Sequence, residues 1–208
     1  MNIDFAQSLI ILVILILCIT VHELAHAIAA DALGDDTPRL QGRITAAPWA
    51  HFDPLGAIMI VVTTLSGFGI GWGKPVQTNP ANFTVNPRLG MAIVAFAGPL
   101  SNIIMAVGGA MALRFGLFGH GETQIVGGLF VLINISLALF NLLPIYPLDG
   151  SHLLTSALPT NLAFKYQQFA RQYGVILFLG LALTGVLGRI IGPARDAIFA
   201  FLVGPLSL

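Results

Sequence analysis

The stretch SLIILVILILCITVHELAHAIAA, from Ser8 to Ala30, is long and apolar enough to decide the fold. A bilayer core about 30 Å thick needs about 20 apolar residues in a helix, and this stretch supplies them. The residues before it, MNIDFAQ, contain Asp4 but no Lys or Arg, so the basic region of a secretory signal is missing. We therefore expect a retained membrane helix rather than a cleaved leader.

The composition extends this interpretation to the whole chain. Of the 208 residues, 56% are hydrophobic and 9% are charged, whereas a soluble domain carries about 25% charged residues. Nine basic and nine acidic residues balance, so no excess of charge points to nucleic acid or anionic lipid. The single cysteine, Cys18, excludes an internal disulfide framework. We expect one membrane-embedded domain over residues 1–208, with no nucleic-acid partner.

The fold class expected is an all-α polytopic membrane protein with about five to six hydrophobic segments. Two polar connections, 31–54 and 71–88, are longer than loops that merely join packed helices, and short β-strands are allowed in them, one around Arg43–Ala46. The apolar segments that follow the first one cover about residues 55–70, 89–113, 124–143, 173–191 and 197–203.

The first segment also contains an HExxH motif, formed by His22, Glu23 and His26. Histidines four residues apart share one face of a helix, and this spacing suits one zinc ion with the glutamate as general base. With five His and two Glu in the chain, the motif arises by chance on the order of once in a thousand such sequences. Ionisable groups at bilayer depth cost about 2.5–3.5 kcal/mol each, which favours a functional site over polar groups that only join helices.

A zinc site of this kind needs a third protein ligand and an open position. The fourth apolar segment ends in NLLPIYPLDG, where Pro144 and Pro147 interrupt the helix just before Asp149. Irregular backbone near membrane depth is tolerated only where protein or a water-filled cavity covers it. Asp149 is therefore a candidate ligand, and the alternative is an ordinary turn residue after a prolyl break.

HExxH in one membrane helix, with NxxPxPxxDG downstream, resembles the site-2 protease family of intramembrane zinc metalloproteases, peptidase family M50. AGPLSN at 97–102, DPLG at 53–56 and GWGKPV at 71–76 are similar to its compact bacterial and archaeal branch. The resemblance covers about residues 21–150. It leaves no sequence for a PDZ or CBS domain, so we expect no such module within this chain.

The resemblance implies which residues hold the metal. His22, His26 and Asp149 would bind one Zn²⁺ per chain, and Glu23 would be the catalytic base.

Two asparagines match motif positions of the family, and one basic position differs. Asn141 and Asn102 are candidates for substrate binding, and hydrogen bonding between helices is the alternative for Asn102. Family members often carry an arginine two residues after the DG pair, whereas this chain has Ser151 and His152 there. We expect His152 to be a solvated or core histidine, with an approach to the metal or substrate as the alternative.

The proposed ligands constrain the topology. His22 and His26 lie toward the C-terminal end of the first segment and Asp149 follows the C-terminal end of the fourth, so both ends must face one side of the membrane. One intervening segment must then not cross, and the short 55–70 segment is the candidate for a re-entrant piece. The ligand side would hold six basic residues and the other side three, which favours a multi-pass protein of a prokaryotic cell membrane with its active site toward the cytoplasm. These six are Arg39, Arg43, Lys74, Arg88, Lys165 and Arg171.

The function expected is an intramembrane zinc metalloprotease that hydrolyses peptide bonds in or near transmembrane segments of membrane proteins. Its partners would be a transmembrane protein or peptide substrate and the lipid bilayer. The alternative left open is a membrane zinc carrier or non-catalytic metal-binding scaffold, although Ser101, Asn102 and Thr184 supply few polar groups for an ion path. A membrane protease with glutamate as third ligand would have to use Glu122, in a loop on the far side.

Overall fold

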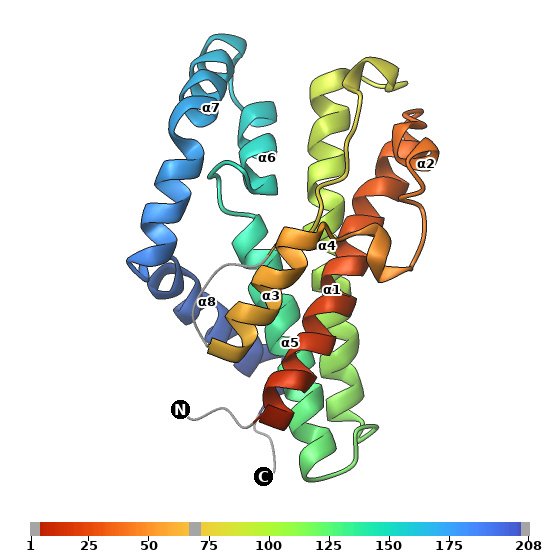
Figure 1. Cartoon of the computed structure of the whole chain (residues 1–208), viewed down its shortest axis with the longest axis vertical. Helices are drawn as coiled ribbons and strands as arrows, with labels where there is room; N and C mark the ends of the chain where they lie inside the picture. Colours follow the sequence, from red (N-terminus) through yellow and green to blue (C-terminus); the bar gives the residue numbers. More distant parts are fainter. Residues whose placement is uncertain (1–4, 67–71, 205–208) are drawn as a thin grey trace.

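The computed structural model describes residues 5–66 and 72–204, and within these ranges the chain is helical with no β-strand. The all-α class expected from the sequence is confirmed. Figure 1 shows the helices in chain order from red to blue. They are α1 (Phe5–Ala32), α2 (Thr37–Leu40), η1 (Pro48–Ala50), α3 (Pro54–Ser66), η2 (Pro80–Asn82), α4 (Pro87–Arg114), α5 (Glu122–Asn141), α6 (Asp149–Ala157), α7 (Thr160–Leu183) and α8 (Val186–Val203).

Three of the described helices, α1, α4 and α5, are individually long and apolar enough to cross a membrane. Helices α7 and α8 pass the same test as a pair, but they are bent by 70° at a short break. Helix α3 is apolar but shorter than a span. The expected number of about five to six hydrophobic segments agrees with this set when α7 and α8 are counted separately.

Helix α4 lies at the centre of the bundle, where it packs against α1, α5, α6 and α8. Small residues let α4 and α5 approach closely, since a Cβ added at Gly109 would lie 2.9 Å from the Phe130 ring. Ala106 and Ala110 of α4 are buried together with Val131 of α5. Close contact between helices is the main source of attraction inside a bilayer, where burial of apolar groups gives little gain.

The segment between His51 and Lys74 begins and ends at the same level, and its helix α3 packs against α1. The Lys74 amide donates to the His51 carbonyl at 2.7 Å, so the two ends of the segment meet. Helix α3 forms its outgoing part, and residues 67–71 lie outside the described part of the chain. That the 55–70 segment is a re-entrant or partly buried piece stays a prediction.

The β-strand expected around Arg43–Ala46 is wrong, because these residues form bends. The Arg43 amide donates to the Pro38 carbonyl at 2.9 Å and closes a turn, which leaves no free edge for a partner strand. In the described residues of both long connections, short helices with a proline in their first turn take the place of strands.

The bounds expected for the fifth apolar segment, 173–191, are also wrong. Helix α7 begins earlier, at Thr160 directly after Pro159, and ends within the expected segment. The break follows from Gly185, whose φ of +71° is left-handed, a conformation that glycine adopts without steric cost. The chain therefore turns sharply where hydropathy alone suggests a continuous span.

Candidate metal centre

His22 and His26 lie one turn apart on α1 and point the same way, as the spacing predicts. Their rings stand edge to face with centroids 4.7 Å apart, and their Nε2 atoms are 3.1 Å apart. Both residues are buried, at 6% and 7% exposure. The helix therefore presents two ring nitrogens toward one point inside the protein.

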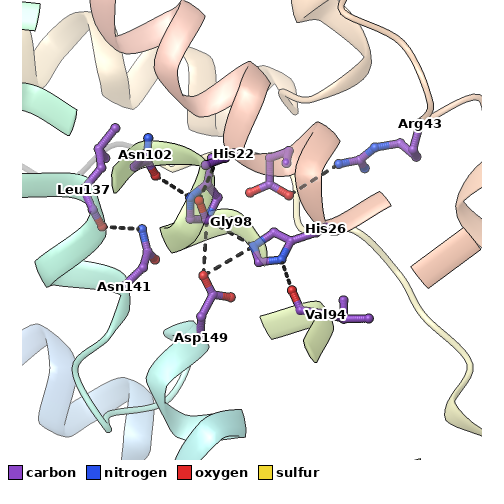
Figure 2. Close-up of polar contacts among 11 residues, drawn as sticks. His22, His26, Arg43, Val94, Gly98, Asn102, Leu137, Asn141 and Asp149 are labelled. Atoms are coloured by element: carbon purple, nitrogen blue, oxygen red, sulfur yellow. Dashed lines mark hydrogen bonds and ion pairs between the residues drawn. The ribbon is translucent and has the colours of Figure 1, made fainter. Parts of the chain in front are cut away.

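Asp149 reaches the same point from the opposite side. Its Oδ2 lies 3.2 Å from Nε2 of His22 and 3.3 Å from Nε2 of His26 (Figure 2). The irregular turn after α5 makes this possible, because it places Asp149 as the first residue of α6. Gly150 is required for the turn, since an added Cβ would lie 2.3 Å from the Leu142 and Leu143 carbonyl oxygens.

The three residues fit a zinc ion. Among the described residues they form the one cluster of His, Cys, Asp or Glu ligand atoms that could hold a metal, with these atoms within 4.8 Å of one another. Tetrahedral bonds of about 2.0–2.2 Å put neighbouring ligand atoms roughly 3.3–3.6 Å apart, close to the separations of 3.1–3.3 Å seen here. Asp149 Oδ2 is buried without a hydrogen-bond partner in the described chain, as a metal ligand would be.

The outer nitrogen of each histidine is held by an oxygen acceptor. Nδ1 of His22 donates to Asn102 Oδ1 at 2.6 Å, and Nδ1 of His26 donates to the Val94 carbonyl at 2.7 Å (Figure 2). Because these acceptors fix the proton on Nδ1, the lone pair of each Nε2 faces Asp149. Such outer partners orient metal-binding histidines and raise their basicity.

A buried polar chain continues behind His22. Asn102 Nδ2 donates to Asn134 Oδ1 at 2.9 Å, and Asn134 Nδ2 reaches the Cys18 sulfur at 3.1 Å and the Phe130 carbonyl at 2.9 Å. Both asparagines have 0% exposure. The sequence analysis did not select Asn134, although an isolated amide within an apolar segment is a signal that could have identified it.

Gly98 of α4 packs directly against the two imidazoles. An added Cβ would lie 2.4 Å from Nε2 of His26 and 2.6 Å from Nε2 of His22. The AGPLSN stretch therefore contributes a contact surface as well as Asn102. The sequence analysis cited this stretch for the family resemblance but did not foresee the role of its glycine.

Glu23 lies beside the cluster, with 12% of its side chain exposed. Its Oε2 is 3.7 Å from Nη2 of Arg43 and has no hydrogen-bond partner in the described chain. Arg43 itself is buried at 2% exposure. It is therefore part of the site, whereas the sequence analysis counted it as a loop charge.

His51 supports the loop that carries Arg43. Its Nε2 donates to the Thr45 carbonyl at 2.7 Å, and the residue is fully buried. Burial lowers the pKa of the His51 imidazole, although the hydrogen bond to Thr45 opposes this effect. The ring therefore serves as a packed support for this loop.

A cavity of about 530 Å³ opens onto the cluster. It is lined by the three candidate ligands and Glu23, and one wall is the extended segment that runs from Trp72 to Thr78. His152 is exposed, in agreement with the expected solvated histidine, but it also lines the cavity and so lies near the site.

Asn141 and Asn102, the two candidates for substrate binding, lie in different places. Asn141 lines the cavity, and its Nδ2 donates to the Leu137 carbonyl at 3.0 Å (Figure 2). Asn102 does not line the cavity, because it is enclosed between His22 and Asn134. Asn102 therefore faces a candidate metal ligand rather than the space that a substrate would occupy.

Comparison with known proteins identifies related sequences. The family model of peptidase family M50 matches residues 118–181. "Putative zinc metalloprotease YwhC" of Bacillus subtilis (strain 168) is 38% identical over 196 residues, which cover 90% of this chain and 86% of that protein. "Putative zinc metalloprotease Rip2" of Mycolicibacterium smegmatis is 28% identical over 180 residues, which cover 84% of this chain and 66% of that protein. No solved structure matches.

Proposed function

Since this chain belongs to peptidase family M50, the site-2 protease family of zinc metalloproteases, we propose that it cleaves peptide bonds in or near transmembrane segments of other membrane proteins. The observation that carries this proposal is the meeting of His22, His26 and Asp149 within 3.1–3.3 Å beside Glu23. The site lies in a cavity bordered by helices that are apolar enough to span a membrane.

In the proposed site, one zinc ion per chain is held by His22, His26 and Asp149. Zinc in such a position lowers the pKa of a water molecule and polarises the scissile carbonyl. Asn102 and the Val94 carbonyl hold the two imidazoles in the orientation that this role requires. Asp149 approaches from a separate helix, so ligation also ties α6 to α1.

Glu23 acts as general base and then as general acid. Its carboxylate borders the cavity, where it can accept a proton from the attacking water and return it to the leaving nitrogen. Proton transfer by a positioned side chain contributes about 10²- to 10⁴-fold to a rate. The buried position beside Arg43 limits the motion of the carboxylate between these two steps.

The substrate has to unwind before it is cleaved, because a helix keeps its carbonyl groups in backbone hydrogen bonds. The extended wall at residues 72–78 is suited to hold an unwound segment by strand addition. Asn141 lines the same cavity and is placed to hydrogen-bond the substrate backbone. Segments with Gly, Pro or Asn are the preferred substrates, since these residues weaken a helix.

A second cavity lies beside the first, on the side of α8. This cavity of about 400 Å³ shares Leu137, Phe140 and Phe178 with the first and extends to Arg195. These three shared residues lie between the two cavities, and in the proposed function a substrate segment would pass them on a lateral approach from the bilayer. A single membrane-embedded domain over residues 1–208 stays part of the proposal, and the contacts of α4 with α1, α5, α6 and α8 support it.

The active site is proposed to face the cytoplasm. Arg43 no longer supports this orientation, because it is buried beside Glu23. The remaining basic residues still favour the ligand side by five to three. Those on the ligand side are Arg39, Lys74, Arg88, Lys165 and Arg171, and those on the other side are Arg114, Arg189 and Arg195.

The test is cleavage of a membrane-spanning substrate by the purified protein in detergent. The substitution Glu23→Gln is expected to reduce the rate by about 10²- to 10⁴-fold, because it removes the proton acceptor. Glu122→Gln is the matched control, since Glu122 is the other glutamate of the chain and lies at the opposite end of α5 from the site. Cleavage by the Glu23 variant at the wild-type rate would refute the general-base role, and bound zinc without cleavage by wild type would favour the carrier or scaffold.

A further inference from the structure

Arg43 is buried in a connection that is otherwise polar and largely exposed. Only 2% of its side chain is accessible, whereas Arg39 in the same connection is 67% exposed. Burial of a guanidinium is costly unless its donors are used. The groups that Arg43 contacts therefore indicate why an arginine is buried at this position.

One set of contacts runs to the backbone of the cavity wall. Nη2 of Arg43 donates to the Lys74 carbonyl, and Nη1 donates to the Pro75 carbonyl at 3.3 Å. The amide of Lys74 is already bound to the His51 carbonyl at 2.7 Å. The rigid planar fork of an arginine can hold two carbonyl groups in a way that lysine cannot. Arg43 thus anchors the wall at the point where it enters the site.

The other contact runs to the general base. Nη2 of Arg43 lies 3.7 Å from Glu23 Oε2 (Figure 2), an oxygen that is buried and without a hydrogen-bond partner in the described chain. The wall also touches this carboxylate, because a Cβ added at Gly73 would lie 3.2 Å from Glu23 Oε1. One side of Glu23 is therefore bounded by Arg43 and the other by the wall that Arg43 holds.

We propose that Arg43 is a positioning residue, which orients the Glu23 carboxylate and fixes it relative to the Lys74–Pro75 wall. The inference rests on the proposed function, since it gives Arg43 a part in the same reaction. The general base and the wall that borders it are then one unit, so that a substrate held along the wall meets a base already in place. Misplacement of a reacting group by about 1 Å can cost about 100-fold in rate, which is the scale of effect expected here.

The first test compares the activity of Arg43→Gln, Arg43→Lys and Arg39→Gln on one membrane-spanning substrate. We expect Arg43→Gln to lower kcat by about 10- to 100-fold while its zinc content stays at the wild-type level. Arg43→Lys keeps the positive charge but loses the planar guanidinium. Its kcat is therefore expected between those of Arg43→Gln and Arg39→Gln. Arg39→Gln is the matched control, because Arg39 binds Asp31 at the surface, and it is expected to behave as wild type.

Two outcomes of this test would overturn the proposal. Wild-type kcat in Arg43→Gln would show that the base is placed without Arg43. A loss of zinc, or a rise in KM with unchanged kcat, would show that Arg43 serves only the metal cluster or the wall.

The second test uses thermal unfolding and does not depend on activity. Removal of one partner of a buried charge pair leaves the other uncompensated, so Arg43→Gln is expected to lower the Tm, and Glu23→Gln added to it is expected to recover part of the loss. Additive effects of the two substitutions would refute the link between the residues. If Arg43→Gln alone does not fold, the double variant must fold, and its failure to do so would also refute the link.

The two tests also separate this proposal from the proposed function. Coupled stability of Glu23 and Arg43 in a protein that cleaves no membrane substrate would leave the pairing intact and refute the protease assignment. If wild type cleaves the substrate, but Glu23 and Arg43 show no coupled stability and Arg43→Gln keeps its kcat, the protease assignment stands and the positioning role of Arg43 is refuted.

Discussion

The candidate metal site depends on a close fit between α4 and the two histidines of α1. At Gly98 of α4, an added Cβ would meet both Nε2 atoms, at 2.4 and 2.6 Å. Contacts this short are incompatible with any Cβ in the present arrangement. The identity of Gly98 therefore follows from the ligands rather than from helix propensity, which would favour alanine.

Substitution of Gly98 tests this fit. Gly98→Ala is expected to displace at least one imidazole and to reduce bound zinc in the purified protein, measured by elemental analysis. Gly108→Ala is the control on the same helix, because an added Cβ there meets nothing within 4 Å and alanine is the better helix former by about 1 kcal/mol. Equal zinc content in both variants would contradict the packing described for Gly98.

The hydrogen bond from His22 to Asn102 makes a separate prediction. Asn102→Leu removes the acceptor for Nδ1 of His22 and is expected to weaken zinc affinity by about 10- to 100-fold, measured by competition with a chelator. Ser101→Ala is the control, since the Ser101 hydroxyl donates only to the Gly98 carbonyl within its own helix. Wild-type affinity in Asn102→Leu would show that the orientation of His22 does not depend on this contact.

At the scale of elements, the two long connections are joined by a buried carboxylate. Asp35 has 0% exposure and accepts hydrogen bonds from the Thr37 amide and hydroxyl, the Asn79 amide and Asn82 Nδ2. Burial alone would raise the pKa of the Asp35 carboxyl, but these hydrogen bonds outweigh it and hold the pKa below its usual value. The connection after α1 is thereby tied to the segment that leads from the cavity wall to α4.

Substitution of Asp35 is expected to loosen this joint. Asp35→Asn should lower the free energy of unfolding by about 1–3 kcal/mol at neutral pH, because charged hydrogen bonds are lost. A depressed folded-state pKa means that the stabilisation is complete above the ordinary Asp pKa of about 3.9 and is lost as pH falls through the lower pKa of the folded state. The difference between wild type and Asp35→Asn should therefore shrink in acid.

Unfolding in detergent at several pH values measures this effect. Asp36→Asn is the matched control, since Asp36 is exposed and makes no capping hydrogen bond with its side chain. An equal loss in both variants, or a loss that does not depend on pH, would contradict the role of Asp35.

The sequence was informative wherever one local pattern determines the outcome. Helical spacing places His22 and His26 on one face, and prolyl breaks place Asp149 at the start of a new helix. Arg43 could not be found in this way, because its role arises from contacts with Glu23 and Lys74 that are remote in the sequence. The absence of a strand around Arg43 has the same cause. A strand would need a neighbouring strand for its backbone hydrogen bonds, whereas turns and side-chain contacts hold this loop.

At the scale of the whole molecule, the ligands require that α1 and α5 end toward one side. Figure 1 shows α1 and α5 running in the same direction and α4 running opposite to both. The segment between His51 and Lys74 begins and ends at the same level, which allows α1 and α5 to run in one direction with α4 between them in the sequence. Hydropathy alone could not decide whether the segment that contains α3 crosses the membrane, because α3 is apolar but shorter than a span.

Labelling of single cysteines tests this topology. In a variant that lacks Cys18, we expect Gln41→Cys to react with an impermeant maleimide in inside-out vesicles and His120→Cys to react in right-side-out vesicles. Both positions are exposed at opposite ends of α4 and its neighbours. The reverse pattern would contradict the cytoplasmic orientation, and labelling of both from one side would contradict the crossing of α4.

The central claim is that His22, His26 and Asp149 together hold one zinc ion while Glu23 does not. The most direct measurement is the zinc content of purified wild type, Asp149→Ala and Glu23→Gln, prepared identically. We expect about one zinc per chain in wild type and in Glu23→Gln, and little or none in Asp149→Ala, because the latter loses one of three protein ligands. Zinc retained by Asp149→Ala at the wild-type level would contradict the claim.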